Sequence, residues 1–280
     1  MHAQAAGVAG RYTGIFPRNR QAPVFKRARI AILLLILAYV GVSALTARAR
    51  IASWERPVRV AVFTIAADDS PATRAYLESL DAGAFADVER FFAEEASRHG
   101  LRLARPVELR HAGRLDTVPP PAPVNGSRLD AILWSLHLRW WVWRHGGDGA
   151  QAAQVRLFVL HHDPARVSTV PHSVGLSKGL VGVVHVFANR SQAAQNAIVI
   201  AHELLHTFGA GDKYDPVANQ PVHPDGYAEP GLVPRHPQRF AEIMAGRTPL
   251  SESRSEMPAS LDDVVIGGRT AGEIGWATSR

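Results

Sequence analysis

The sequence predicts an α/β domain that follows a membrane-spanning helix, and three features support this. An uncharged apolar run occupies residues 30–47, and valine-rich segments alternate with helical segments over residues 56–188. A further helical segment, at 191–208, carries two histidines four residues apart. Alternating strands and helices are typical of a mostly parallel sheet covered by helices. We therefore expect a basic N-terminus over 1–29, an anchor over 30–47 and one domain over 52–280.

The predicted anchor is the run IAILLLILAYVGVSALTA, residues 30–47. Its eighteen residues make roughly 27 Å of helix, which is close to the hydrocarbon thickness of a bilayer. Basic residues flank the run and residues 1–50 contain no acidic residue. This asymmetry predicts a single-pass protein of the cell membrane with a cytoplasmic N-terminus and a periplasmic or extracellular body. The Ala-Arg-Ala motif at 47–49 keeps a cleaved signal peptide as the alternative.

Charge and cysteine content exclude several classes of site. The formal net charge is +6, but the first fifty residues contribute +8, so the remaining body is slightly acidic. A slightly acidic body does not favour phosphate contacts, and we expect no nucleic-acid partner. The chain has no cysteine, which excludes disulfides and thiolate metal sites.

The elements of the domain follow from hydrophobic periodicity. In chain order, the sequence predicts a strand at 56–69, a helix at 82–100, a strand at 101–110, a proline-rich loop at 117–127, a helix at 127–147, and strands at 154–162 and 179–188. The helix at 82–100 places five apolar residues on one face, and we expect that face in the core: Phe85, Val88, Phe91, Phe92 and Ala96.

The helix at 127–147 is unusually rich in tryptophan, with Trp134, Trp140, Trp141 and Trp143. Such a cluster is compatible with a membrane interface or a platform for stacking bases. However, helical spacing collects six residues on one face, and this favours packing against the core: Leu129, Ile132, Leu133, Leu136, Trp140 and Trp143.

The segment IAHELLHTFGAGDKYD, residues 200–215, carries the chemistry. His202 and His206 are one helical turn apart, so both imidazoles can reach one metal ion. Glu203 points along a different line and can take a proton from a metal-activated water. Gly209 suits the place where the helix must stop and the chain must turn back, because glycine tolerates a positive φ.

This segment resembles the metzincin zinc peptidases, whose pattern is H-E-x-x-H-x-x-G-x-x-H. The third histidine of that pattern is replaced here by Asp212, as in the minority of snapalysin-like enzymes. The resemblance continues in FAEIMAGR, residues 240–247, which is similar to the methionine turn beneath the zinc and places Met244 there. Residues 260–276 are similar to the C-terminal helix after that turn. The resemblance thus implies a metzincin-like twisted sheet with an antiparallel edge strand, an active-site helix and a C-terminal helix.

The resemblance also implies a function. One catalytic Zn²⁺ would be held by His202, His206 and Asp212, and Glu203 would act as the general base in hydrolysis of a peptide or protein substrate. Met244 would form an apolar floor. The substrate would pair with an edge strand that includes Gly182, Val183, Val184, His185 and Val186.

Several alternatives stay open at this point. Asp215, His223 or Asp225 could replace Asp212 as the third ligand, and Tyr214 or Tyr227 could donate a hydrogen bond to an oxyanion. The domain could instead be an inert, metal-stabilised binding module on the membrane surface. It could also be a zinc hydrolase of a non-peptide amide bond.

Overall fold

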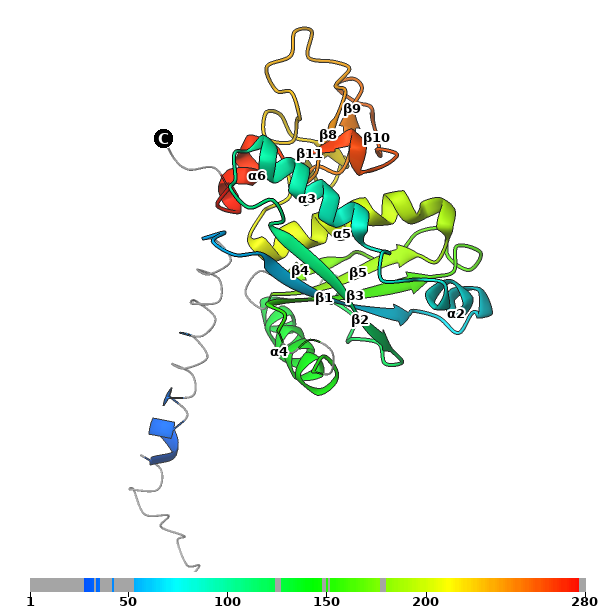
Figure 1. Ribbon diagram of the computed structural model, residues 1–280, viewed down its shortest axis with the longest axis vertical. Coiled ribbons are helices and arrows are strands. Elements are labelled where there is room, and N and C mark those ends of the chain that lie inside the picture. Colours follow the sequence, from blue (N-terminus) through cyan, green and yellow to red (C-terminus); the bar gives the residue numbers. More distant parts are fainter. Residues whose placement is uncertain are drawn as a thin grey trace, which may run out of the picture. The chain divides into compact units, whose positions relative to one another are not determined.

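The computed structural model describes residues 28–32, 34–35, 42, 53–123, 127–147, 150, 152–176 and 180–276 (Figure 1). The chain divides into two compact units, residues 1–43 and 44–280. The described residues of the first unit are helical. The elements described below belong to the second unit, which we call the body.

The predicted membrane anchor is corrected by the structure. Much of the segment 30–47 lies outside the described residues. Among the residues that are described, no helix combines the length and the apolar character that crossing a bilayer requires. This finding contradicts the predicted transmembrane helix, and with it the predicted single-pass location in the cell membrane.

The body contains one main sheet, several helices and a C-terminal region of short strands. Its elements are β1 (Val58–Ala66), α2 (Pro71–Glu78), α3 (Ala86–Arg98), β2 (Val107–Leu115), α4 (Arg128–His145), β3 (Val155–His162), β4 (Val174–Leu176), β5 (Val181–Phe187), η1 (Arg190–Gln192) and α5 (Ala193–Phe208). After α5 come β6 (Tyr214–Asp215), β7 (Gln220–Pro221), β8 (Ala241–Glu242), β9 (Thr248–Pro249), β10 (Ser255–Glu256), η2 (Leu261–Asp263), β11 (Val264–Val265) and α6 (Gly268–Glu273).

The main sheet is mostly parallel, in the order β2-β1-β3-β5-β4. β1 pairs in parallel with β2 and β3, and β3 pairs in parallel with β5. Only β4 runs antiparallel, and it forms the edge beside β5. The central strand β1 is buried along almost its whole length, as expected for a parallel strand covered on both faces. A mixed α/β body with a mostly parallel sheet is therefore present.

The two faces of this sheet build two separate cores. On one face, residues of β1, β3 and β5 such as Val60, Leu157 and Val184 pack against α3 and α5. On the other face, residues such as Phe63, Phe158 and Val183 pack against α4. Figure 1 shows α3 and α5 on one side of the sheet and α4 on the other.

Most predicted elements are present, with shifted boundaries. The predicted apolar face of α3 is confirmed, because Phe85, Val88, Phe91, Phe92 and Ala96 are all buried. The strand predicted at 101–110 begins later, at Val107. The helix predicted at 260–276 is mostly irregular and reduces to the six residues of α6.

The predicted packing of α4 is wrong. The six residues assigned to its core face are all exposed, from 56% for Ile132 and Trp140 to 76% for Trp143. The buried side of α4 instead presents Leu138, Trp141 and Val142. Because α4 is apolar around most of its circumference, periodicity could not identify the side that meets the sheet.

Candidate metal centre

Helix α5 carries the two histidines and the glutamate of the predicted site. It is fixed to the sheet by Asn196, whose side chain accepts a hydrogen bond from the Phe187 N–H at 3.2 Å and donates one to the Phe187 carbonyl at 2.8 Å. The helix ends at Gly209, which has a φ of 111°. A side chain at this φ would be strained, so glycine allows the chain to turn back toward the histidines.

Both imidazoles are oriented by backbone carbonyls. His202 Nδ1 lies 2.9 Å from the Ile243 carbonyl oxygen, and His206 Nδ1 lies 2.9 Å from the Ala210 carbonyl oxygen. A carbonyl oxygen only accepts, so each Nδ1 carries the proton and donates it. Each Nε2 of a neutral ring is then left with a lone pair, which is the arrangement that a metal-binding histidine needs.

Asp212 meets both of these nitrogens. Its Oδ1 lies 3.2 Å from His202 Nε2 and 3.2 Å from His206 Nε2. Donor atoms around a tetrahedral zinc ion, with bonds of about 2.0 to 2.1 Å, stand about 3.3 Å apart. Without a cation, two lone pairs and a carboxylate would repel one another at this spacing. The three atoms therefore fit either a shared metal ion or protonated histidines.

Two of the other candidates for third ligand, Asp215 and His223, are engaged elsewhere. The Asp215 carboxylate accepts hydrogen bonds from the backbone N–H groups of Val217 and Ala218. His223 Nε2 lies 3.2 Å from the Pro230 carbonyl oxygen, and its ring packs against Tyr227. The geometry thus selects Asp212 over Asp215 and His223.

The Asp212 carboxylate and His202 stabilise each other's charged forms. Burial opposes protonation of His202, but the Asp212 and Glu203 carboxylates and the Ile243 carbonyl raise its pKa above the ordinary value. Burial also acts against the Asp212 anion, yet the two histidines lower the pKa of Asp212 well below its usual range. The cluster is therefore built to hold an anionic Asp212 facing positive charge.

Glu203 of α5 lies beside the two histidines and is buried, at 6% exposure. Burial raises the pKa of its carboxyl group, although the neighbouring histidines oppose that rise. Its Oε2 is a buried oxygen with no hydrogen-bond partner. His202, Glu203 and His206 offer ligand atoms within 4.8 Å of one another. A buried carboxylate oxygen without a partner needs a hydrogen-bond donor. A water molecule between Glu203 and the two histidine nitrogens would provide one.

The edge strand β4 lies directly against the site. A Cβ atom at Gly175 would come within 2.5 Å of the Glu203 carbonyl oxygen and of the His206 Cβ, so only glycine fits there. The predicted edge strand is thus misplaced. Residues 182–186 belong to β5, which pairs with β3 along its length and with β4 over its first part. β4 was missed because three residues show no periodicity.

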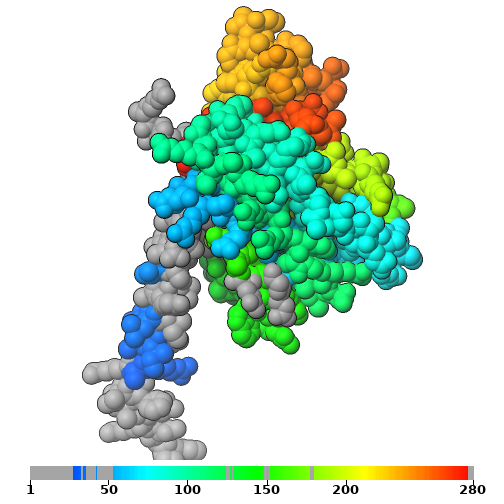
Figure 2. Space-filling model, in the orientation of Figure 1, coloured from blue at the N-terminus to red at the C-terminus, as the bar shows by residue number. Residues whose placement is uncertain are grey.

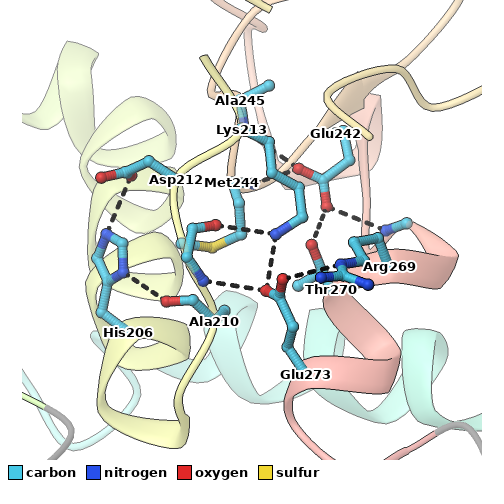
Figure 3. Close-up of polar contacts among 12 residues, drawn as sticks. His206, Ala210, Asp212, Lys213, Glu242, Met244, Ala245, Arg269, Thr270 and Glu273 are labelled. Atoms are coloured by element: carbon cyan, nitrogen blue, oxygen red, sulfur yellow. Dashed lines mark hydrogen bonds and ion pairs between the residues drawn. The ribbon is translucent and has the colours of Figure 1, made fainter. Parts of the chain in front are cut away.

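Met244 and its turn lie beneath the segment that carries Asp212 and Lys213 (Figure 3). Met244 is fully buried, and its carbonyl oxygen accepts a hydrogen bond from the Lys213 N–H at 3.0 Å. The turn is organised by Glu242, whose carboxylate accepts from the N–H of Met244 at 2.6 Å and from the Thr270 hydroxyl at 2.5 Å. Burial raises the pKa of Glu242, and these bonds oppose the rise.

A partly buried acid, Glu273, holds the segment that carries Asp212. The Lys213 ammonium group, 4% exposed, donates to Glu273 at 2.7 Å and to the Gly211 carbonyl at 2.9 Å. Glu273 in turn accepts from the Gly211 N–H at 3.0 Å (Figure 3). The residues on both sides of Asp212 are thus tied to α6. Nothing in the sequence indicated this pairing, because the partners are sixty positions apart.

A small pocket opens beside His202. Its volume is about 210 Å³, and its lining includes Ile198, Val199, Tyr214 and Arg247. Burial, Asp212 and Glu203 raise the pKa of the Tyr214 hydroxyl. Of the two tyrosines considered as oxyanion donors, Tyr214 adjoins the cluster, while the Tyr227 hydroxyl lies 3.1 Å from His236 Nε2.

Comparison with known proteins adds one partial relationship. No family model matches the chain. A tRNA (guanine(37)-N(1))-methyltransferase of Plasmodium vivax (strain Salvador I) is 30% identical over 105 residues. That match covers 34% of this chain and 15% of the methyltransferase, so the chain spans a small part of that relative.

The comparison and the described helices together correct three predictions. The predicted function, membrane-anchored hydrolysis of peptide bonds, is contradicted because the matched protein is a methyltransferase and no described helix can cross a membrane. The predicted partners, a membrane reached through the N-terminal helix and no nucleic acid, are contradicted on the same grounds, since the name of the relative states a tRNA substrate. The predicted fold class fails in its transmembrane helix. The relative is an enzyme, which is consistent with an enzymatic role here.

Proposed function

We propose that His202, His206 and Asp212 hold one zinc ion and that the body is a zinc-dependent hydrolase whose site is of the metzincin type. The observation that supports this most is the position of Asp212 Oδ1, 3.2 Å from both Nε2 atoms. The donor set favours zinc, because two imidazole nitrogens and one carboxylate oxygen are common zinc ligands and the chain has no thiolate to offer.

The residues of the site divide the work. A bound zinc ion would supply a Lewis acid that lowers the pKa of water. The Glu203 carboxylate, whose Oε2 has no hydrogen-bond partner, would accept a proton from water at this centre and return it to the leaving group. The Ile243 and Ala210 carbonyls keep both rings in the tautomer that leaves Nε2 free. Tyr214 is the candidate donor to a developing oxyanion.

The proposal is limited to water activation at this centre. It does not extend to peptide bonds or to a membrane anchor, for which the comparison and the fold give no support.

The test separates ligand from base. His202→Ala should lower zinc affinity by more than the 10- to 100-fold that is typical of losing an outer partner of a ligand. Glu203→Gln should bind zinc within about threefold of wild type but lose most hydrolysis of an activated ester, by roughly 10²-fold or more. Zinc affinity is measured by competition with a chromogenic chelator, and His223→Ala is the matched histidine control.

Two results would contradict the proposal. One is a wild-type protein that takes up no zinc in this competition. The other is a Glu203→Gln variant that hydrolyses the ester as fast as wild type, which would remove the glutamate from the mechanism.

The partial match favours a second candidate, methyl transfer to tRNA. A cavity of about 1030 Å³ lies near the amino ends of β1, β2 and β3, and its lining includes Arg56, Arg59 and Arg110 together with Glu55 and Glu108. Ligands of open α/β sheets usually bind at the carboxyl ends of the strands, so the position of this cavity supports methyl transfer less well than the metal centre supports hydrolysis. Calorimetry with S-adenosylmethionine tests it, and saturable binding with transfer of a labelled methyl group to tRNA would favour it over hydrolysis.

A further inference from the structure

Helix α4 exposes a continuous apolar face on the side away from the sheet. The exposed fractions are 70% for Leu129, 56% for Ile132, 65% for Leu133, 59% for Leu136, 56% for Trp140 and 76% for Trp143. In Figure 2 the α4 segment, in green, forms part of the outer surface of the body. Large contiguous apolar patches on a protein surface usually mark a binding site.

The six residues form one stripe. At 100° per residue they fall within an arc of about 100°, and the buried residues Leu138 and Val142 lie on the opposite side of the helix. The helix therefore has two apolar faces. The face with Leu138, Trp141 and Val142 is covered by the sheet, while the outward stripe has no cover among the residues that the structure describes.

Cationic side chains border the stripe on both sides. Arg139 is exposed and projects about 20° beyond one border, and Arg144 is exposed and projects about 20° beyond the other. The one acidic residue of the helix, Asp130, lies outside the stripe and is used in the N-terminal cap, where its carboxylate accepts from the Ser127 N–H at 2.7 Å. The stripe is thus complementary to an apolar partner that carries negative charge along its borders.

These features discriminate between occupants. A second copy of α4 would place arginines against arginines. A nucleic acid would provide the charge, but four of the six residues are Leu or Ile and cannot stack on bases. An anionic lipid surface satisfies both requirements, because aliphatic side chains enter the acyl region, tryptophans settle at the interface and arginines extend to the headgroups.

We propose that α4 lies flat in the headgroup region of an anionic lipid surface and is the lipid-contacting element of the body. Four charged residues in α4 prevent it from spanning a bilayer, so the contact is peripheral. The proposal rests on α4 alone and is independent of the metal centre on the other face of the sheet.

The absence of cysteine allows a site-specific test on the 280-residue chain. Leu136→Cys is labelled with an environment-sensitive fluorophore and mixed with vesicles of phosphatidylcholine and phosphatidylglycerol. The fluorescence should rise about twofold or more and be quenched by a spin label on the acyl chains. Val217→Cys, at a site 96% exposed in the β6–β7 turn, is the matched control and should not respond. Any vesicle binding by the N-terminal segment affects both proteins equally.

Charge dependence gives the second readout. Vesicles of phosphatidylcholine alone should give a weaker signal, and Arg139→Gln or Arg144→Gln should each weaken the α4 response by about fivefold. The proposal is overturned if the label at 136 does not respond, or if the label at 217 responds equally. It is also overturned if the label at 136 is shielded by raising the protein concentration without lipid, or by tRNA but not vesicles.

Discussion

Helices α4 and α5 cover opposite faces of the same sheet and differ in which of their polar and apolar residues are buried. α5 buries its apolar side and also buries Glu203, with His202 and His206 mostly covered. α4 exposes Asp130, Arg139 and Arg144 and leaves most of its large apolar residues outside as well. The polar groups of the candidate metal centre therefore lie on the α5 face of the sheet, whereas the α4 face exposes large apolar side chains. The difference shows that hydrophobicity alone does not identify which side of a helix is buried.

The contrast can be tested most strongly on the two sides of α4. Phe158→Ala should lower the free energy of unfolding by about 3 to 5 kcal/mol, because the ring is fully buried, stacks on Phe63 and meets Trp141 edge to face. Trp143→Ala should change it by at most about 0.5 kcal/mol, since that ring is 76% exposed. Urea unfolding of both variants provides the measurement. A large loss from Trp143→Ala would mean that the outward face of α4 is covered within this chain.

The sequence predicted the α5 side well because its signals are local. The spacing of His202, Glu203 and His206 and the stop at Gly209 depend on a single helix and its end, and the structure brings Asp212 to the same centre. The boundary of β2 and the position of β4 depend on pairing with distant strands, and periodicity says little about that. For α4, both sides are apolar, so the orientation was decided by tertiary packing.

The α5 side also contains a buried histidine whose effect appears in the pH dependence of stability. His161, at the end of β3 and 3% exposed, packs against Tyr76, and burial lowers its pKa to about 4. Between about pH 6.5 and 4 the unfolded chain binds a proton that the folded protein does not. Stability therefore falls as the pH drops through this window, by on the order of 3 kcal/mol, and levels off below it.

His161→Phe should remove this part of the acid sensitivity. The measurement compares urea midpoints near pH 7 and near pH 4.5 for wild type, His161→Phe and His137→Phe. His137 is exposed on α4, so its replacement removes a histidine without removing a buried one. Equal acid sensitivity in wild type and His161→Phe would show that His161 is not the source.

The groups that support the metal centre were not predictable from the sequence. Glu242 of β8 accepts a hydrogen bond from Thr270 of α6, and Glu273 of α6 accepts one from Lys213, so both join segments that are far apart along the chain. Glu242 shapes the turn at Met244, and Glu273 ties Gly211 and Lys213 on either side of Asp212. Such pairings leave no local pattern, because any acidic residue on a later element could supply them.

The smallest effect we expect comes from this support. Glu273→Gln should lower zinc affinity by about tenfold, because the segment that holds Asp212 loses its charged tie to α6. Arg269→Gln is the matched control: Arg269 also pairs with Glu273, at 3.2 Å, but it is exposed and does not contact the ligand segment, so zinc affinity should change less than twofold. Chelator competition at fixed pH measures both.

A second pair of variants separates positioning from stability. Replacing Lys213 and Glu273 together by methionine removes both charges of a mostly buried ion pair, and apolar replacement of buried ion pairs is often neutral for folding. The double variant should therefore unfold near the wild-type midpoint yet still bind zinc about tenfold more weakly, because the bonds to Gly211 are gone. If its zinc affinity returns to the wild-type value with its stability, the ion pair only stabilises the fold, and Asp212 owes its position to the turn after Gly209 and the hydrogen bond from Lys213 to Met244.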